Sequence, residues 1–181
     1  MELIIVTGMP GAGKSEIAQI FRDAGVPVIV MGDIVRREAK RRGLKATPDN
    51  TRHIMLELRE RDGPGAIASR CIEDFQSQSA NLIVIEGCRS IAEVDVFDDF
   101  ADRVTIIGVH SSPRARFERL QSRHREDAPT TWSVFHERDM REISVGLGGV
   151  IALSDIMVVN EGSLDSFRRE ARLIVQRLNR G

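Results

Sequence analysis

Several residue types are scarce in this chain of 181 residues, and each scarcity excludes a class of protein. There is no Tyr, and only one Trp and seven Phe, so a platform that stacks single-stranded nucleic-acid bases is not expected. The net charge of −1 argues against a strongly basic nucleic-acid surface, although it allows a local basic pocket. No apolar run approaches the roughly 20 residues of a membrane span, so no membrane association is expected.

Cysteine is also scarce. Cys71 and Cys88 are the only two, and they are interpreted as free thiols rather than a structural bridge. The first residues lead directly into an apolar strand pattern, which leaves no room for a signal peptide, and a cytoplasmic location is expected. Apolar residues make up 41% and charged residues 29%, which is ordinary for a globular chain. We therefore predict one domain over residues 1–181.

The most specific pattern is Gly-Met-Pro-Gly-Ala-Gly-Lys-Ser, which follows the apolar run Leu-Ile-Ile-Val-Thr and precedes a helical pattern. It matches the phosphate-binding loop G-x-x-x-x-G-K-[ST] in the strand–loop–helix setting that this loop requires. Backbone N–H groups and the helix dipole would hold the phosphates of ATP, Lys14 would reach the β- and γ-phosphates, and Ser15 would ligate Mg²⁺. The predicted ATP-binding residues are Gly8, Met9, Pro10, Gly11, Ala12, Gly13, Lys14 and Ser15.

Five nearly continuous apolar runs alternate with helical patterns, as expected for parallel strands that are covered on both faces. The predicted strands are 3–7, 27–31, 82–86, 103–109 and 155–159. The fold class is therefore α/β, a three-layer P-loop NTPase with a five-stranded parallel sheet. Ligands of such sheets bind at the carboxyl ends of the strands, which draws attention to the polar residues there.

Two helical regions interrupt this alternation. Residues 33–81 hold three helical patterns, the second beginning at the Thr47-Pro48 cap signal, and are predicted to form an acceptor-binding insertion. Residues 124–141 are predicted to form a lid, with Thr130 or Thr131 capping a helix whose Trp132, Phe135 and Ile143 face inward.

Charged residues outside the phosphate loop suggest phosphoryl transfer, which requires positive charge, a metal and exclusion of water. Arg36 and Arg89 follow strands, and the bidentate guanidinium suits phosphate oxygens. Glu86 ends the third strand and is predicted to orient Mg²⁺ through water, or else to be an ordinary loop or capping carboxylate. Asp33 either caps a helix or positions and deprotonates an acceptor hydroxyl. The four His residues lack metal-ligand spacing.

These residues resemble those of the nucleoside monophosphate kinases, adenylate kinase above all. There, G-D-x-x-R and D-G-x-x-R elements each supply an arginine to the monophosphate acceptor. The first resembles Gly-Asp-Ile-Val-Arg at 32–36. The second resembles Glu-Gly-Cys-Arg at 86–89, which is one residue shorter and has Glu in place of Asp. The acceptor-binding residues that this implies are Asp33, Arg36, Glu86, Gly87 and Arg89.

The resemblance extends to the lid and the C-terminal part. Arg119 and Arg123 have the R-x-x-x-R spacing at the lid base of adenylate kinase, which implies contacts with the adenine and phosphates of ATP. Lys14, with Arg123 or Arg138, is expected to stabilise the transferring charge. Residues 152–164, including the candidate ATP-binding residue Asn160, look more like dephospho-CoA kinase, where an Asp at the position of Asp33 activates the ribose 3′-hydroxyl.

Over essentially its whole length the chain is similar to a largely archaeal family described as adenylate-kinase-related or dephospho-CoA-kinase-like. Two departures matter: the lid lacks the zinc spacing of four cysteines, and no motif that reads the AMP base is identified. An ATP- and Mg²⁺-dependent kinase acting on AMP or another small nucleotide is the first hypothesis, with dephospho-CoA as the alternative acceptor. A nucleotide-binding regulator without turnover stays open. A GTPase switch is disfavoured because no N-K-x-D element follows a strand.

Overall fold

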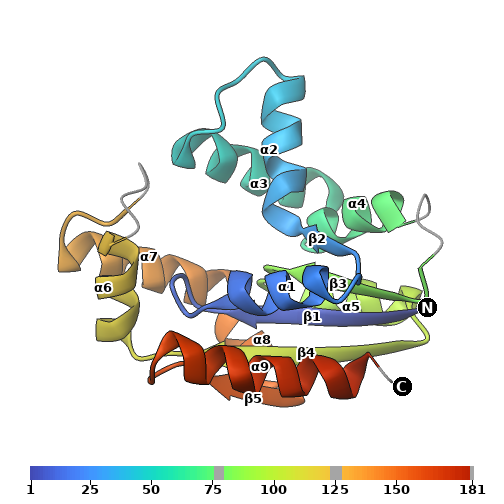
Figure 1. Ribbon diagram of the computed structural model, residues 1–181. Helices are drawn as coiled ribbons and strands as arrows, with labels where there is room; N and C mark the ends of the chain where they lie inside the picture. Colours follow the sequence, from blue (N-terminus) through green and yellow to red (C-terminus); the bar gives the residue numbers. More distant parts are fainter. Residues whose placement is uncertain (76–79, 123–127, 180–181) are drawn as a thin grey trace.

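The computed structural model describes residues 1–75, 80–122 and 128–179. Within these residues, all strands form one sheet in the order β2-β3-β1-β4-β5, and every neighbouring pair is parallel (Figure 1). The strands are β1 (Glu2–Gly8), β2 (Val28–Val30), β3 (Leu82–Glu86), β4 (Arg103–His110) and β5 (Ile156–Val159). The five predicted strands and the parallel three-layer fold are thereby confirmed.

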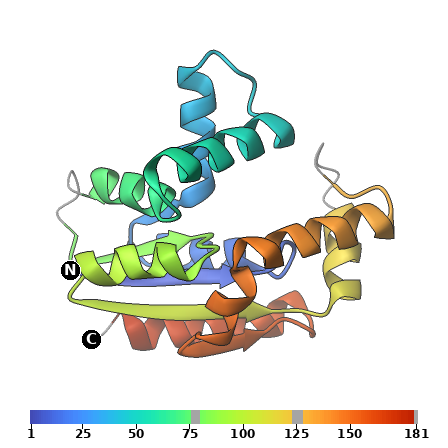
Figure 2. The same cartoon turned by 180° about the vertical axis from the view of Figure 1, so that it is seen from behind.

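Helices cover both faces of the sheet, and alternation along the strands divides the core between them. Leu3 and Ile5 of β1 belong to one buried cluster, whereas Ile4 and Val6 belong to the other. Figures 1 and 2 show α1 and α9 on one face, and α5 and α8 on the other. These covering helices are α1 (Lys14–Asp23), α5 (Ile91–Phe100), α8 (Leu147–Ala152) and α9 (Leu164–Leu178).

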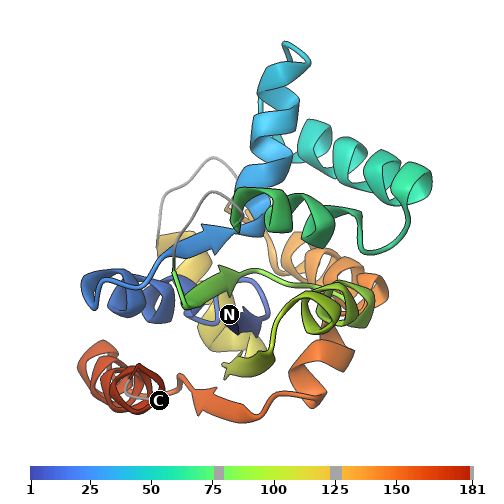
Figure 3. The same cartoon turned by 90° about the vertical axis from the view of Figure 1, so that its right-hand side faces the viewer.

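The expected insertion, residues 33–81, is helical in its described part and extends beyond β2, the strand at one edge of the sheet (Figure 3). Its helices are α2 (Met31–Arg41), α3 (Pro48–Asp62) and α4 (Ala66–Phe75). Ile54, Leu58 and Phe75 of this insertion share one buried cluster with Ile83 and Ile85 of β3. The insertion is therefore packed onto the same core as the sheet.

The insertion differs from the prediction at its start. Helix α2 begins at Met31, directly after β2, and its cap is Val30, which makes no side-chain cap hydrogen bond. The interpretation of Asp33 as a helix cap was therefore wrong: Asp33 lies inside the first turn, where a carboxylate still interacts favourably with the helix dipole.

The region after β4 contains α6 (Pro113–Ser122) and α7 (Trp132–Val145). Thr131 caps α7, its hydroxyl accepting from the Val134 amide, as predicted. Phe135 is buried, but Trp132 is 48% exposed and Ile143 is 47% exposed, so their predicted inward orientation was wrong. Helix α7 is covered on only part of its circumference. Within the described residues, no helix combines the length and apolar character that crossing a membrane requires.

Candidate phosphate-binding site

The phosphate loop joins β1 to α1 at the carboxyl edge of the sheet (Figure 1). Gly13 immediately precedes α1 with φ of 119°, a region that L side chains rarely adopt. A Cβ there would lie 2.6 Å from the Asn160 amide nitrogen, which itself donates to the Ala12 carbonyl at 2.8 Å. Asn160, directly after β5, thus packs against the loop so closely that only Gly fits, and this explains why the motif needs its second glycine, Gly13.

Lys14 begins α1, and its ammonium donates to the carbonyls of Gly8 at 2.7 Å and Met9 at 3.2 Å. Burial lowers the pKa of Lys14 to about 8, with the positive charge of Arg89 as the next cause. Glu86 and Glu142 act in the opposite direction, and their carboxylates raise this pKa. Lys14 is therefore partly buried among several charged groups, a position to which an incoming polyphosphate would be strongly attracted.

Ser15 and Glu86 meet beside this lysine. The Ser15 hydroxyl donates to a Glu86 carboxylate oxygen at 2.9 Å, and Glu86 is only 8% exposed. Their juxtaposition follows from the sheet, because β3 lies next to β1 and Glu86 stands opposite Val6. A hydroxyl and a carboxylate are hard oxygen donors, so the pair fits a Mg²⁺ ion that takes its other ligands from phosphate and water.

The described residues include no group of three or more His, Cys, Asp or Glu side chains that could enclose a metal.

Arg89 lies at the same edge of the sheet, after the Gly87 turn that follows β3. Its guanidinium Nε is 3.5 Å from a Glu142 carboxylate oxygen, and its Nη1 is 3.9 Å from the Met55 sulfur of α3. The charge of Arg138, one helical turn before Glu142 on α7, also lowers the pKa of Lys14. Two arginines from different parts of the chain, Arg89 in the loop after β3 and Arg138 on α7, thus act electrostatically on Lys14.

The sequence reasoning missed Glu142, although one signal for it was present. It stands four residues after Arg138, and residues at that spacing share a face of a helix. A carboxylate among these cations balances part of their charge. It also competes with an anionic ligand for Arg89.

Asp33 and Arg36, both predicted to contact the acceptor, contact each other on α2. The Arg36 Nε donates to an Asp33 carboxylate oxygen at 2.9 Å, and both side chains are about half exposed. An exposed ion pair of this kind contributes little to stability, so a ligand can replace either partner at low cost.

Two further predicted ATP-binding residues, Arg119 and Asn160, contact each other next to Ala12 of the phosphate loop. Arg119 donates to the Ser111 hydroxyl at 2.8 Å and to the Asn160 carbonyl at 2.7 Å. Arg123, assigned above to ATP binding and charge stabilisation, lies outside the described residues, as do positions 124–127 of the predicted lid.

The described part of the lid region is anchored to the phosphate loop. Arg116 is buried and donates to both carboxylate oxygens of Asp139 on α7, at 2.9 and 2.5 Å, and to the Pro10 carbonyl at 3.1 Å. Its guanidinium also lies 5.0 Å from the centre of the Phe135 ring. Sequence reasoning gave Arg116 no special role; the structure makes it the link between the loop and α7.

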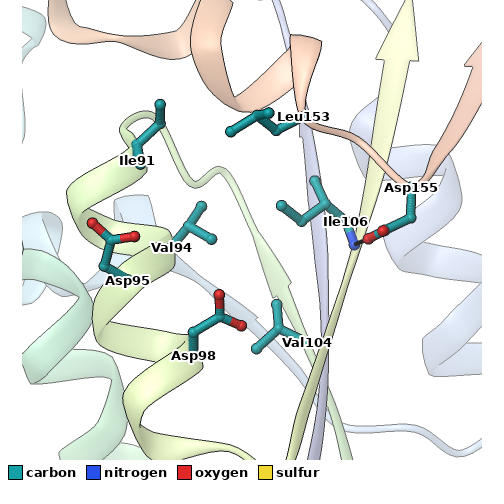
Figure 4. Close-up of a pocket in the computed structure, with 8 residues that line it drawn as sticks. All are labelled: Ile91, Val94, Asp95, Asp98, Val104, Ile106, Leu153 and Asp155. Carbon is teal, nitrogen blue, oxygen red and sulfur yellow. Dashed lines mark hydrogen bonds between the residues drawn. The ribbon is translucent and has the colours of Figure 1, made fainter.

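A separate hollow of about 270 Å³ lies between α5, the first half of β4 and the segment before β5 (Figure 4). Figure 4 shows the carboxylates of Asp95, Asp98 and Asp155, of which Asp155 accepts the Ile106 amide at 2.7 Å. None of the residues predicted for nucleotide binding lines this hollow.

Comparison with known proteins supports the fold and the loop. Residues 7–136 match a family model described as an AAA domain. Two solved structures share the architecture, and at these identities the likeness concerns the fold alone. TT1252 from Thermus thermophilus has a TM-score of 0.66 at 16% identity, covering 97% of each chain. A gluconokinase from Sinorhizobium meliloti 1021 has a TM-score of 0.55 at 18% identity, covering 98% of this chain and 93% of that one.

Much nearer relatives carry the name UPF0200 protein. One from Hyperthermus butylicus is 47% identical over 97% of this chain and 94% of its own length. One from Thermococcus sibiricus is 44% identical over 97% and 95%, and MJ1399 from Methanocaldococcus jannaschii is 43% identical over 98% and 91%. With identities of 43–47% over nearly the whole chain, the chain belongs to the UPF0200 family.

Proposed function

We propose that the protein is an ATP-dependent phosphotransferase that moves the γ-phosphate of ATP to a small nucleotide, with AMP as the preferred acceptor. The observation that carries this proposal is the hydrogen bond between Ser15 and Glu86 at the end of the phosphate loop, with Arg89 at the same edge of the sheet and 3.5 Å from Glu142 of α7. The positive charges of Arg89 and Arg138 both lower the pKa of Lys14. A loop that only held a nucleotide would need Lys14 and the Ser15–Glu86 pair. Two additional arginines beyond the loop suit a second phosphate group and the charge that develops during transfer.

In this proposal the predicted residues divide among the triphosphate, the metal and the acceptor, and Glu86 serves both the metal and the acceptor. Residues 8–15 bind the triphosphate, with Arg119 and Asn160 beside the adenosine end. Ser15 and, through water, Glu86 hold Mg²⁺, which supplies charge neutralisation at the phosphates. Residues 33–81 would hold the acceptor, with Arg36 and Arg89 binding its phosphate and Asp33, Glu86 and Gly87 contacting the rest of it.

The transfer itself needs no base when the acceptor is a monophosphate. An acceptor phosphate oxygen, already anionic at neutral pH, forms the new bond to the γ-phosphorus as the bond to the β-phosphate oxygen breaks and ADP leaves with that electron pair. Lys14 and Arg138, with Arg123 from the predicted lid, would stabilise the charge.

The ATP-dependent reaction implies a cytoplasmic protein, and one domain over residues 1–181 would hold both substrates.

A hydroxyl acceptor such as dephospho-CoA is the second candidate, because the Asp33 carboxylate is solvent-accessible on the first turn of α2. The Asp33 carboxylate would take the hydroxyl proton as the hydroxyl oxygen bonds to the γ-phosphorus, the bond from that phosphorus to the β-phosphate oxygen breaks, and ADP leaves with the electron pair.

The test is a set of reactions with Mg²⁺, ATP and one acceptor each: AMP, other nucleoside monophosphates or dephospho-CoA, with products separated by chromatography. We expect ADP from ATP plus AMP, and none from the Lys14→Ala variant. Formation of CoA would assign the second candidate and make Asp33 the base. ATP binding without transfer to any acceptor would overturn the proposal in favour of a nucleotide-binding regulator.

A further inference from the structure

Glu93 is one of the most buried charged residues described, with 1% of its surface exposed, and it does not belong to the predicted site. It stands in the first turn of α5, immediately after the loop that carries Arg89. Burying a carboxylate is costly unless each oxygen finds a strong donor. The partners of Glu93 therefore show what this buried charge holds in place.

One carboxylate oxygen of Glu93 accepts the backbone N–H of Arg89 at 2.8 Å. The carbonyl of the same peptide group, that of Cys88, accepts the Thr7 hydroxyl at 2.9 Å in a fully buried contact. The Cys88–Arg89 peptide is thus held at its N–H by α5 and at its C=O by β1. Two opposed hydrogen bonds fix the plane of a peptide, and this plane sets the direction in which the Arg89 side chain leaves the backbone.

The sequence Ser90-x-x-Glu93 has the form of a capping box, and the Ser90 hydroxyl accepts the Glu93 amide at 3.3 Å as that motif requires. In the usual box the acidic side chain reaches back to the N–H of the capping residue itself. Here it reaches one residue further, to Arg89. The Glu93 carboxylate therefore does not cap the helix in the ordinary way. It binds the backbone of Arg89, which is predicted to bind the phosphate acceptor.

The other carboxylate oxygen of Glu93 accepts Arg59 of α3 at 2.7 Å. Met55, one turn earlier on α3, has its sulfur 3.9 Å from the Arg89 guanidinium. Helix α3 therefore contacts Arg89 at its side chain directly and at its backbone through Glu93. The Arg59 Nε is buried with no hydrogen-bond partner among the described residues, so stability alone does not account for this ion pair.

We propose that Glu93 is a positioning residue for acceptor binding: it fixes the peptide that carries Arg89 and ties it to α3, so that the acceptor arginine and the insertion keep one relative geometry. This inference rests on the proposed function, in which Arg89 binds the acceptor phosphate. Glu93 itself touches neither substrate, and its effect passes through Arg89.

The test compares steady-state kinetics of the wild type, Arg89→Ala, Glu93→Gln and Arg59→Lys, with AMP varied at saturating ATP and ATP varied at saturating AMP. Glu93→Gln keeps the size and one carbonyl acceptor but loses the charge. Arg59→Lys keeps the positive charge on α3 but replaces the guanidinium that donates to Glu93 with a shorter side chain. We expect each to raise the KM for AMP about tenfold while the KM for ATP changes less than about twofold. Arg89→Ala should raise the KM for AMP at least as much.

Glu118→Gln is the matched control, because Glu118 is also a carboxylate paired with an arginine, Arg114, but lies on α6, outside the residues proposed to bind either substrate. It should leave both KM values unchanged. A double variant, Glu93→Gln with Arg89→Ala, should be no worse for AMP than Arg89→Ala alone, because Glu93 acts through Arg89. This non-additivity separates positioning from a general loss of stability, which would add to the effect of Arg89→Ala.

The outcomes separate the two proposals. Suppose that the wild type transfers phosphate to AMP and that Arg89→Ala impairs this transfer. If Glu93→Gln and Arg59→Lys then change neither KM value, or change both KM values equally, the role of Glu93 is refuted and the proposed function stands. If the wild type transfers phosphate to no acceptor, the proposed function fails and the role of Glu93 falls with it. If Glu93→Gln does not fold, Arg59→Lys decides, and failure of both to fold makes the pair a stability element and overturns the proposal.

Discussion

The Ser15 hydroxyl donates a 2.9 Å hydrogen bond to the Glu86 carboxylate, which joins the first turn of α1 to the last residue of β3. Seventy-one positions separate the two residues in the chain, and the parallel pairing of β1 with β3 brings them together. The same contact orders two oxygen donors at the point where the phosphate loop ends. We therefore expect these side chains to act as a unit in Mg²⁺ binding.

Ser15→Ala and Glu86→Gln should each raise the Mg²⁺ concentration that gives half-maximal phosphate transfer, by about tenfold. Each substitution removes one oxygen donor from the metal or its waters. The double variant should show much less than the product of the two effects, because residues in one hydrogen-bonded unit are not additive. A Mg²⁺ titration of the initial rate at saturating ATP measures all three.

Asp98→Asn serves as the control, since Asp98 is an exposed carboxylate beside the hollow between α5 and β4. It should leave the Mg²⁺ titration unchanged. A Glu86→Gln variant with the wild-type Mg²⁺ dependence would show that Glu86 only supports the Ser15 hydroxyl.

The pH dependence should follow Lys14, whose pKa is lowered to about 8 by burial and by Arg89. The ammonium is present below this pH and is lost above it, so kcat/KM for ATP, which reports the free enzyme, should fall as the pH rises through about 8. An active Lys14→Arg variant should lack this fall, because the guanidinium does not titrate in this range. An equal fall in that variant would assign the titration to another group.

Much of the fold could be predicted from sequence because its signals are local. The five apolar runs, the Thr131 cap and the glycines of the phosphate loop each specify structure within a few residues. Ser15 and Glu86 were predicted separately to serve one Mg²⁺ ion, and the hydrogen bond between them was not predicted.

The remaining features depend on contacts between distant segments. No local pattern distinguishes Arg116, which is buried against Asp139, from Arg114, which is exposed on the same helix. Glu142 reaches the site only because α7 is anchored across the phosphate loop. The start of α2 at Met31 likewise follows from packing of Met31 into the core, not from a capping residue.

Both cysteines should be inert in the folded protein, although free. Burial raises the pKa of Cys71 to about 12, and burial together with the Glu93 charge also raises the pKa of Cys88. Iodoacetamide at pH 8 should add no mass to the native protein and two carbamidomethyl groups after unfolding in guanidinium chloride, as measured by intact mass spectrometry. Modification of Cys88 in the native state would show that the loop carrying Arg89 opens.

The buried Arg116–Asp139 pair should dominate the attachment of α7. Arg116→Met leaves the Asp139 carboxylate buried without its partner, which should lower the free energy of unfolding by about 3–5 kcal/mol in urea. Arg116→Met with Asp139→Leu should recover part of that loss, because it removes both charges. Arg114→Met, which breaks an exposed pair with Glu118 one turn away, should leave the unfolding midpoint unchanged. Equal effects of Arg116→Met and Arg114→Met would contradict the anchoring of α7, since only the first arginine also donates to the Pro10 carbonyl of the phosphate loop.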